Sequence, residues 1–140
     1  MKYKFPINMK GLIGETIVYY YLRKEKYRYR DGHFVYWNNR FEHEGDVRRI
    51  IKSTKHHWHV PLDTAQRRKL VKHIKDKKYV PDFLVHLNSQ EIIFFEVKYG
   101  NSVLNKNQKE FKNLCKELNI KYNLLRIKNI TMDGCEILIE

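Results

Sequence analysis

Residues 80–98 read VPDFLVHLNSQEIIFFEVK, two apolar runs separated by a polar triplet at 88–90. Runs of Val, Ile and Phe on either side of a short polar connection are typical of a β-hairpin. If the two runs pair antiparallel across that triplet, positions whose numbers sum to 178 face each other. Asp82 then lies directly opposite Glu96, with the two β-carbons roughly 4.5–5.5 Å apart. The hairpin therefore predicts two carboxylates in contact.

The second run, residues 91–98, ends in Glu96, Val97 and Lys98. Side chains alternate along a strand, so Glu96 and Lys98 share one face while Val97 points to the other. Like charges that face each other repel, and burying them is costly unless a positive charge compensates. A divalent cation such as Mg²⁺ would compensate, and a nearby ammonium can help deprotonate a water. The alternative is that Lys98 only forms an ordinary cross-strand ion pair.

The chain has 140 residues, a length typical of one domain, and a net charge of +12. Residues 21–78 hold 17 Lys and Arg against 7 Asp and Glu, which places +10 of that charge in this stretch. A basic surface favours a polyanionic partner, although it also suits anionic membranes or plain solubility. Within this stretch, we expect residues 27–78 to contact the partner.

Cys115 and Cys135 lack the paired spacing of a zinc site or a disulfide framework, which favours a reducing intracellular setting. Residues 1–6 lack the apolar core of a signal peptide, and no run approaches the roughly 18 apolar residues of a membrane span. The sequence therefore predicts a soluble cytoplasmic protein with no membrane segment.

The flanking segments supply two more polar side chains for the hairpin. Helical spacing of apolar residues predicts a helix over 9–26, in which Gly11 and Gly14 suggest close backbone packing. Glu15 lies on its apolar face and needs a partner, or else serves as a first-turn acid favoured by the helix dipole. A second helix over 105–118, capped by Asn105, directs Gln108 at the sheet near Glu96.

The remaining elements are shorter. Aromatic and polar residues alternate over 27–30 and 33–37 around Asp31-Gly32, which indicates a hairpin or two strand fragments. Helices are expected over 41–55 and 64–78, and the basic face of the second is either solvated or follows phosphates. Strands over 122–127 and 135–139 complete a mixed α/β fold.

Two polar clusters compete with the hairpin as metal sites. His56, His57 and His59 are too close together to reach one tetrahedral ion easily, so a surface or DNA-contacting loop is favoured. The acids at 42, 44 and 46 could supply a further metal ligand, but a solvated loop is favoured there too.

The pattern of Pro81-Asp82, an apolar strand, Glu96-Val97-Lys98 and then Leu104 and Gln108 resembles the PD-(D/E)XK nuclease superfamily. It is most similar to the VRR-NUC branch, and archaeal Holliday junction resolvases look similar at the same positions. The resemblance covers residues 80–128 well and Gly14-Glu15 loosely, and it leaves residues 27–78 uncovered. It implies a restriction-endonuclease-like core, a mixed sheet flanked by helices, with a basic insertion before the catalytic hairpin.

The resemblance also implies a role for each motif residue. Asp82 and Glu96 would hold Mg²⁺ or Mn²⁺ with the main-chain carbonyl of Val97, and Lys98 would orient or activate the attacking water. Gln108 would support the site, and Glu15 would hold a second ion or a metal-bound water. These roles imply a metal-dependent DNA endonuclease.

The implied substrate is junction, flap or nicked DNA in replication, recombination or repair, and a homodimer would supply two sites for a symmetric junction. The alternatives are an RNA-directed nuclease and a nucleic-acid-binding module that keeps the fold without catalysis.

Overall fold

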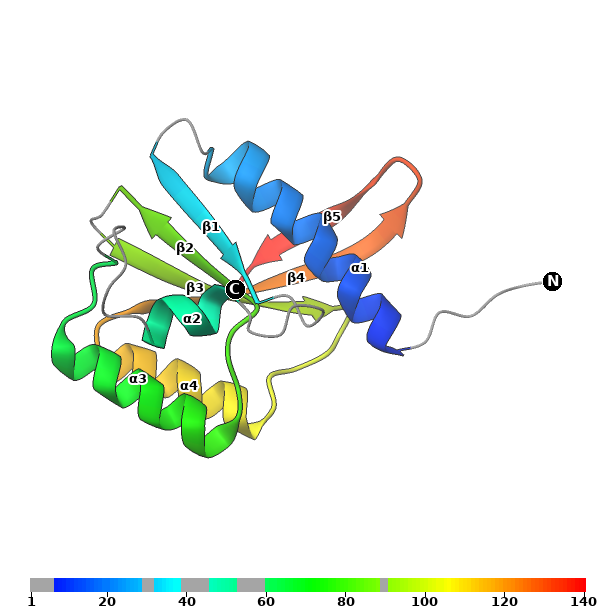
Figure 1. Ribbon diagram of the computed structural model, residues 1–140. Coiled ribbons are helices and arrows are strands. Elements are labelled where there is room, and N and C mark those ends of the chain that lie inside the picture. The colour runs from blue at the N-terminus through cyan, green and yellow to red at the C-terminus, as the bar shows by residue number, and fades with distance from the viewer. Residues whose placement is uncertain (1–6, 29–31, 39–45, 53–59, 89–90) are drawn as a thin grey trace.

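The computed structural model describes residues 7–28, 32–38, 46–52, 60–88 and 91–140. A mixed five-stranded sheet, in the order β1-β2-β3-β4-β5, has α1 on one face and α2, α3 and α4 on the other (Figure 1). The elements are α1 (Ile7–Tyr20), the π-helix η1 (Tyr21–Lys26), β1 (His33–Trp37), α2 (Asp46–Lys52), α3 (Thr64–Lys77), β2 (Phe83–Leu87), β3 (Glu91–Tyr99), α4 (Lys106–Glu117), β4 (Lys121–Thr131) and β5 (Gly134–Ile139). The expected mixed sheet flanked by helices is confirmed.

The central hairpin has the expected register. β2 and β3 pair antiparallel, with Phe83 opposite Phe95 and Leu87 opposite Glu91. Both pairs sum to 178, so one further step along the ladder brings Asp82 to the level of Glu96. Asp82 is the residue just before β2, at the end of the sheet where β3 is about to finish.

Parallel pairing of β3 with β4 depends on α4, which crosses between them. This helix begins at a capping box: Asn105 accepts a hydrogen bond from the backbone N–H of Gln108, and the Gln108 side chain accepts one from the backbone N–H of Asn105, both 2.9 Å. The predicted helix and its cap are confirmed. β4 and β5 then form the expected C-terminal hairpin.

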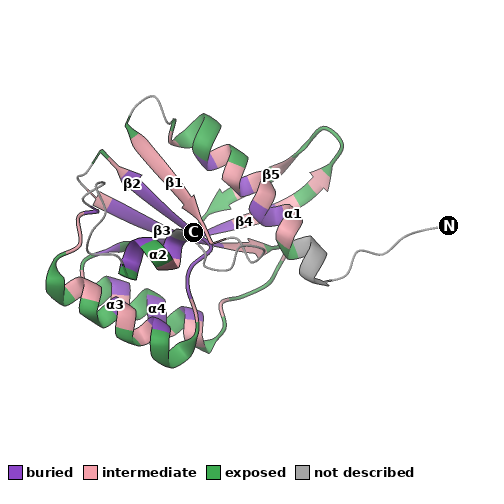
Figure 2. Cartoon of the chain, viewed as in Figure 1, coloured by how far each residue is buried: buried purple, intermediate pink, exposed green. Residues whose placement is uncertain are grey.

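The sheet separates two apolar clusters, because alternate residues of each strand point to opposite faces. On the side of α2, α3 and α4, Leu84 and Phe94 pack with Phe111. On the side of α1, Phe83 and Phe95 pack with the helix through residues such as Val18. The central strands are accordingly the most continuously buried part of the molecule (Figure 2). Each fully buried Phe contributes about 2–3 kcal/mol of transfer free energy.

Gly14 lets α1 lie close to the sheet. A β-carbon at this position would be 3.6 Å from Val97 Cγ1 and 4.0 Å from Ile127 Cγ1, so the backbone itself forms the contact surface. The close packing expected from the sequence is confirmed for Gly14, whereas Gly11 has nothing within 4 Å of such a carbon. Val97 points toward α1, as strand alternation predicts.

Of the hairpin or two strand fragments expected around Asp31-Gly32, the second strand fragment is confirmed, and it does not pair locally in the part that the structure describes. Residues 33–37 form β1, but its partner is β2, with Val35 opposite Val85. Residues 27 and 28 belong to no strand, and 29–31 lie outside the described residues. Pairing with the apolar β2 buries more of the β1 side chains than a short hairpin could. The predicted helix over 9–26 continues past Tyr20 as the π-helix η1.

The segment 27–78 contributes to the core and is not a separate addition. It supplies the edge strand β1, and its helices bury Ile51 of α2 and Leu70 of α3 in the cluster that holds Phe94. Of the helix expected over 41–55, the structure describes α2 alone. The acids at 42 and 44, the side chain of Asp46 and the histidines at 56, 57 and 59 lie outside the described part.

His86 of β2 is a buried imidazole, 2% exposed, and neither ring nitrogen has a hydrogen-bond partner in the described part of the chain. Burial lowers the pKa of His86. As the pH falls through about 6.5, His86 becomes protonated in the unfolded chain but stays neutral in the folded chain. The free energy of unfolding therefore decreases in acid. We expect His86→Phe to raise the free energy of unfolding by about 1–2 kcal/mol at pH 8, and by more at pH 5.5. Urea titrations of both proteins measure this margin, and a margin independent of pH would contradict the explanation.

Candidate active site

Asp82 and Glu96 meet at the end of the central hairpin. The two side chains are 8% and 4% exposed. The backbone N–H of Asp82 donates to Glu96 Oε2 at 3.3 Å, and the backbone N–H of Val97 donates to Asp82 Oδ2 at 2.8 Å. Each carboxylate thus accepts from the backbone at or next to the other acid, so the two residues that the register brings to one level do lie side by side.

Glu15 reaches the same place from α1. It is 7% exposed, and its Oε1 accepts a hydrogen bond of 3.1 Å from the indole N–H of Trp37, at the end of β1. The Glu15 side chain also lies close enough to Asp82 for its charge to raise the pKa of Asp82. Neighbouring carboxylates repel each other, and a positive charge between them relieves that repulsion.

Gln108 and Tyr79 hold the two oxygens of Glu96. Gln108 Nε2 donates to Oε1 at 2.7 Å, from the first turn of α4. The Tyr79 hydroxyl donates to Oε2 at 2.8 Å, from the segment that precedes β2. The capping box fixes the Gln108 amide from behind, since its oxygen is bound to the Asn105 N–H. Glu96 is therefore oriented from both sides.

Lys98 is half-buried two residues beyond Glu96, and its charge acts on that carboxyl, where it favours the ionised form. Among the described residues, no ion pair joins Lys98 to Asp82 or Glu96; the pairs are Lys77–Glu110, Lys121–Glu91 and Arg126–Glu140. The ordinary cross-strand ion pair that the sequence left open is not formed.

Burial makes ionisation of the acids unfavourable. The pKa of Asp82 lies well above its usual range because the group is desolvated, and the neighbouring charges of Glu96 and Glu15 raise it further. Desolvation likewise raises the pKa of Glu96 to about 7, against the opposing effects of the Tyr79 hydrogen bond and the Lys98 charge. Perturbed carboxyl groups of this kind are enriched at functional sites.

The donor set suits a hard divalent cation that keeps part of its water. Carboxylate oxygens are the protein ligands that Mg²⁺ prefers, and it is often held by only one or two of them together with water and substrate phosphates. Within the described ranges, no group of three or more His, Cys, Asp or Glu side chains is arranged to enclose an ion alone. Asp82 and Glu96 are thus the residues that would hold one, with Glu15 beside Asp82.

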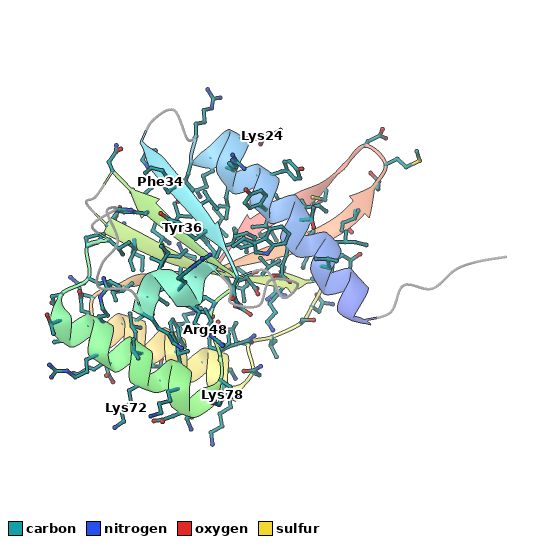
Figure 3. All side chains as sticks on the ribbon, in the orientation of Figure 1. Lys24, Phe34, Tyr36, Arg48, Lys72 and Lys78 are labelled. Carbon is teal, nitrogen blue, oxygen red and sulfur yellow. The ribbon has the colours of Figure 1, made fainter. Side chains whose placement is uncertain are left out.

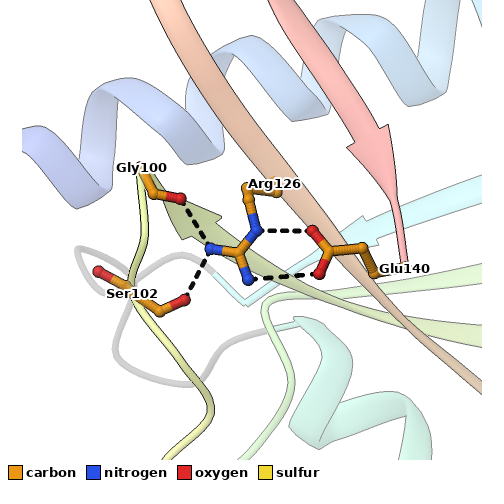
Figure 4. A network of polar contacts seen from close by, with 4 residues as sticks. All are labelled: Gly100, Ser102, Arg126 and Glu140. Carbon is orange, nitrogen blue, oxygen red and sulfur yellow. Dashed lines mark hydrogen bonds and ion pairs between the residues drawn. The ribbon is translucent and has the colours of Figure 1, made fainter.

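The loop after β3, next to Lys98, is fixed by Arg126 of β4. The guanidinium donates to the carbonyl oxygens of Gly100 and Ser102, both at 2.7 Å, and is clamped by the Glu140 carboxylate at 2.6 Å (Figure 4). A planar guanidinium can hold several acceptors at once. Arg126 therefore ties this loop to β4 and to Glu140.

A cavity of about 650 Å³ lies elsewhere, at the start of β3 and β4 and the end of α4. Its lining includes Lys112, Lys116 and Lys121, and Glu91, the one acid among its described lining residues, is paired with Lys121 at 3.3 Å. Neither Asp82 nor Glu96 is among the lining residues of this cavity.

Two members of the site, Tyr79 and Trp37, are not among the residues expected from the sequence. Tyr79 stands three residues before Asp82, so a hydroxyl so close to the motif is a local signal that could have found it. Trp37 has no such signal, because its place beside Glu15 follows from the long-range pairing of β1 with β2.

None of the described helices is both long enough and apolar enough to cross a membrane. Comparison with protein-family models, with curated proteins and with solved structures gives no match for this chain.

Proposed function

We propose that the chain is a metal-dependent DNA endonuclease with a restriction-endonuclease-like core, as the PD-(D/E)XK pattern implies. The observation that supports this most directly is the buried pair of Asp82 and Glu96, whose unfavourable ionisation a divalent cation would relieve. Bound Mg²⁺ or Mn²⁺ would neutralise charge that develops on the phosphate during in-line attack.

Each residue of the candidate site has its own role in the proposed reaction. Asp82, Glu96 and the carbonyl of Val97 would hold the ion, and Glu15 would hold a second ion or a metal-bound water. Lys98, whose ammonium favours negative charge nearby, orients the attacking water and helps to remove its proton. Gln108 keeps Glu96 in place.

Nucleic acid is the substrate class that the charge favours. The exposed faces of α3 and α4 carry Lys72, Lys75, Lys109 and Lys112, among others. Lys72 and Lys78 extend from the α3 region away from the sheet (Figure 3). Lys78 follows α3 directly and precedes Tyr79 in the chain. Such contacts track phosphates without reading bases, which suits a structure-specific enzyme.

A substrate panel tests the proposal. Purified protein is incubated with junction, flap, nicked, single-stranded and duplex DNA and with matched RNA, each with Mg²⁺, Mn²⁺ or EDTA. We expect cleavage of at least one branched or nicked DNA with either metal, none with EDTA, and none by Glu96→Ala. Binding without products under any metal would favour a non-catalytic module, and cleavage of RNA alone would redirect the substrate.

We further propose a homodimer, since a symmetric junction presents two strands to be cut and a two-fold dimer brings two sites to them. Light scattering with and without junction DNA measures the mass. A monomer in both conditions would argue against a junction-resolving role and leave flap or nick cleavage open.

A further inference from the structure

The Tyr79 hydroxyl connects Glu96 to a second buried phenol. Its oxygen is 2.8 Å from Glu96 Oε2, to which it donates, and 2.8 Å from the hydroxyl of Tyr122 on β4. A tyrosine has a single O–H, and that of Tyr79 goes to Glu96, so Tyr122 must be the donor between the two hydroxyls. The chain of donors therefore runs from Tyr122 through Tyr79 and ends on one carboxylate oxygen.

The two oxygens of Glu96 are occupied unequally. Oε2 accepts from the Tyr79 hydroxyl at 2.8 Å and from the Asp82 backbone N–H at 3.3 Å. Oε1 accepts from Gln108 Nε2 at 2.7 Å, its one partner among the described residues. A carboxylate oxygen offers about two acceptor positions. Those of Oε2 are filled, and one of Oε1 remains for a cation.

We propose that Tyr79 is a positioning residue that makes Glu96 a ligand through Oε1 alone and thereby selects Mg²⁺ or Mn²⁺ over Ca²⁺. The inference rests on the proposed function, in which Glu96 holds the ion. Ca²⁺ takes six to eight oxygens and often binds both oxygens of one carboxylate, whereas Mg²⁺ requires a tight octahedron that one oxygen per carboxylate suits. Because the Tyr79 hydroxyl is bound to Glu96 Oε2, that oxygen is not free to coordinate Ca²⁺.

The ring of Tyr79 can be kept while its hydroxyl is removed. It packs edge-on against Phe111 of α4, with the ring centroids 5.4 Å apart, and a phenylalanine retains this contact. Tyr79→Phe therefore isolates the hydroxyl. Tyr122→Phe is the matched control, because it removes a buried phenol O–H of the same chain but leaves the bond from Tyr79 to Glu96 in place.

Calorimetric titration of the metal-free full chain with Mn²⁺ and with Ca²⁺, without nucleic acid, tests the selection. We expect Tyr79→Phe to weaken Mn²⁺ binding about tenfold, the usual effect of losing an outer hydrogen bond to a ligand. Ca²⁺ binding should change by less than about twofold, because Ca²⁺ gains access to Oε2 and this offsets the lost hydrogen bond. The Kd for Ca²⁺ divided by the Kd for Mn²⁺ then falls by about fivefold or more in Tyr79→Phe. In Tyr122→Phe this ratio stays within about twofold of the wild-type value. An unchanged ratio in Tyr79→Phe overturns the inference, even if the wild type cleaves DNA and the proposed function stands.

A crystal structure of the wild type with Mn²⁺ gives a second test that needs no variant to fold. We expect the ion on Glu96 Oε1, with Oε2 still bound to Tyr79. An ion on Oε2, or on both oxygens, overturns the inference and leaves the proposed nuclease intact. If the wild type cleaves none of the substrates in the panel, that separate result overturns the proposed function itself.

Discussion

Asp82→Asn is expected to reduce the rate of DNA cleavage by at least about 10³-fold while DNA binding stays within about threefold of the wild type. The asparagine keeps the size of the side chain and can still accept from the Val97 backbone N–H, so the hairpin remains intact. It removes one of the two charges that would hold the cation. Single-turnover cleavage at saturating Mg²⁺ and fluorescence anisotropy with the same labelled DNA separate the two effects.

The matched control is Asp133→Asn, which makes the same change at an exposed residue of the β4–β5 turn. We expect its cleavage rate to equal that of the wild type. If Asp82→Asn cleaves as fast as the control, Asp82 is not a metal ligand and the assignment of the site is wrong. If it loses binding and cleavage together, its role is in contacting DNA.

Glu96→Gln is expected to stabilise the metal-free protein at pH 8 by about 2 kcal/mol, even though it removes the proposed activity. The pKa of Glu96 is raised from its ordinary 4.5 to about 7, chiefly by burial. Below about pH 4.5 the group is protonated whether the chain is folded or not, and it has no effect on stability. As the pH rises to 7 the unfolded chain loses its proton first, so folding stability declines, and above 7 the full cost is present.

The glutamine cannot ionise, so the gain should appear above pH 7 and vanish near pH 4.5. The raised pKa of Glu96 implies a gain of roughly 3 kcal/mol. The net gain is smaller, because the glutamine NH₂ group would face Tyr79 or Gln108, which donate to the Glu96 carboxylate, and one hydrogen bond is lost. Urea unfolding at both pH values in EDTA measures the gain, with Glu136→Gln, an exposed acid of β5, as control. Saturating Mg²⁺ should stabilise the wild type and not the variant. A variant less stable than the wild type at pH 8 would contradict the electrostatic explanation.

The sequence contained most of what locates the two central acids. Register follows from a short polar connection and strand alternation, which are local, and Phe83 opposite Phe95 confirms it. The cap at Asn105 is equally local, and it places Gln108 against Glu96. The apolar face of the first helix also shows that Glu15 needs a partner, and the structure places it beside Asp82, with the Trp37 indole as its hydrogen-bond donor.

The placement of β1 and of Trp37 could not be predicted, because it depends on pairing between distant parts of the chain. β1 joins β2 across about fifty residues, with His33 opposite Leu87, and neither alternation nor turn residues encode such a choice. The position of Trp37 beside Glu15 follows from that pairing alone. The conversion of the end of the first helix into η1 also has no signal in the apolar spacing.

The stretch between the first helix and the central hairpin has a consequence for protein engineering. Because β1 is a sheet strand and because Ile51 and Leu70 fill the core, this stretch cannot be excised or exchanged as a cassette. Removing it would expose the outer side of β2 and one face of the sheet together. Substrate preference would have to be altered one surface side chain at a time, on a scaffold whose interior stays untouched.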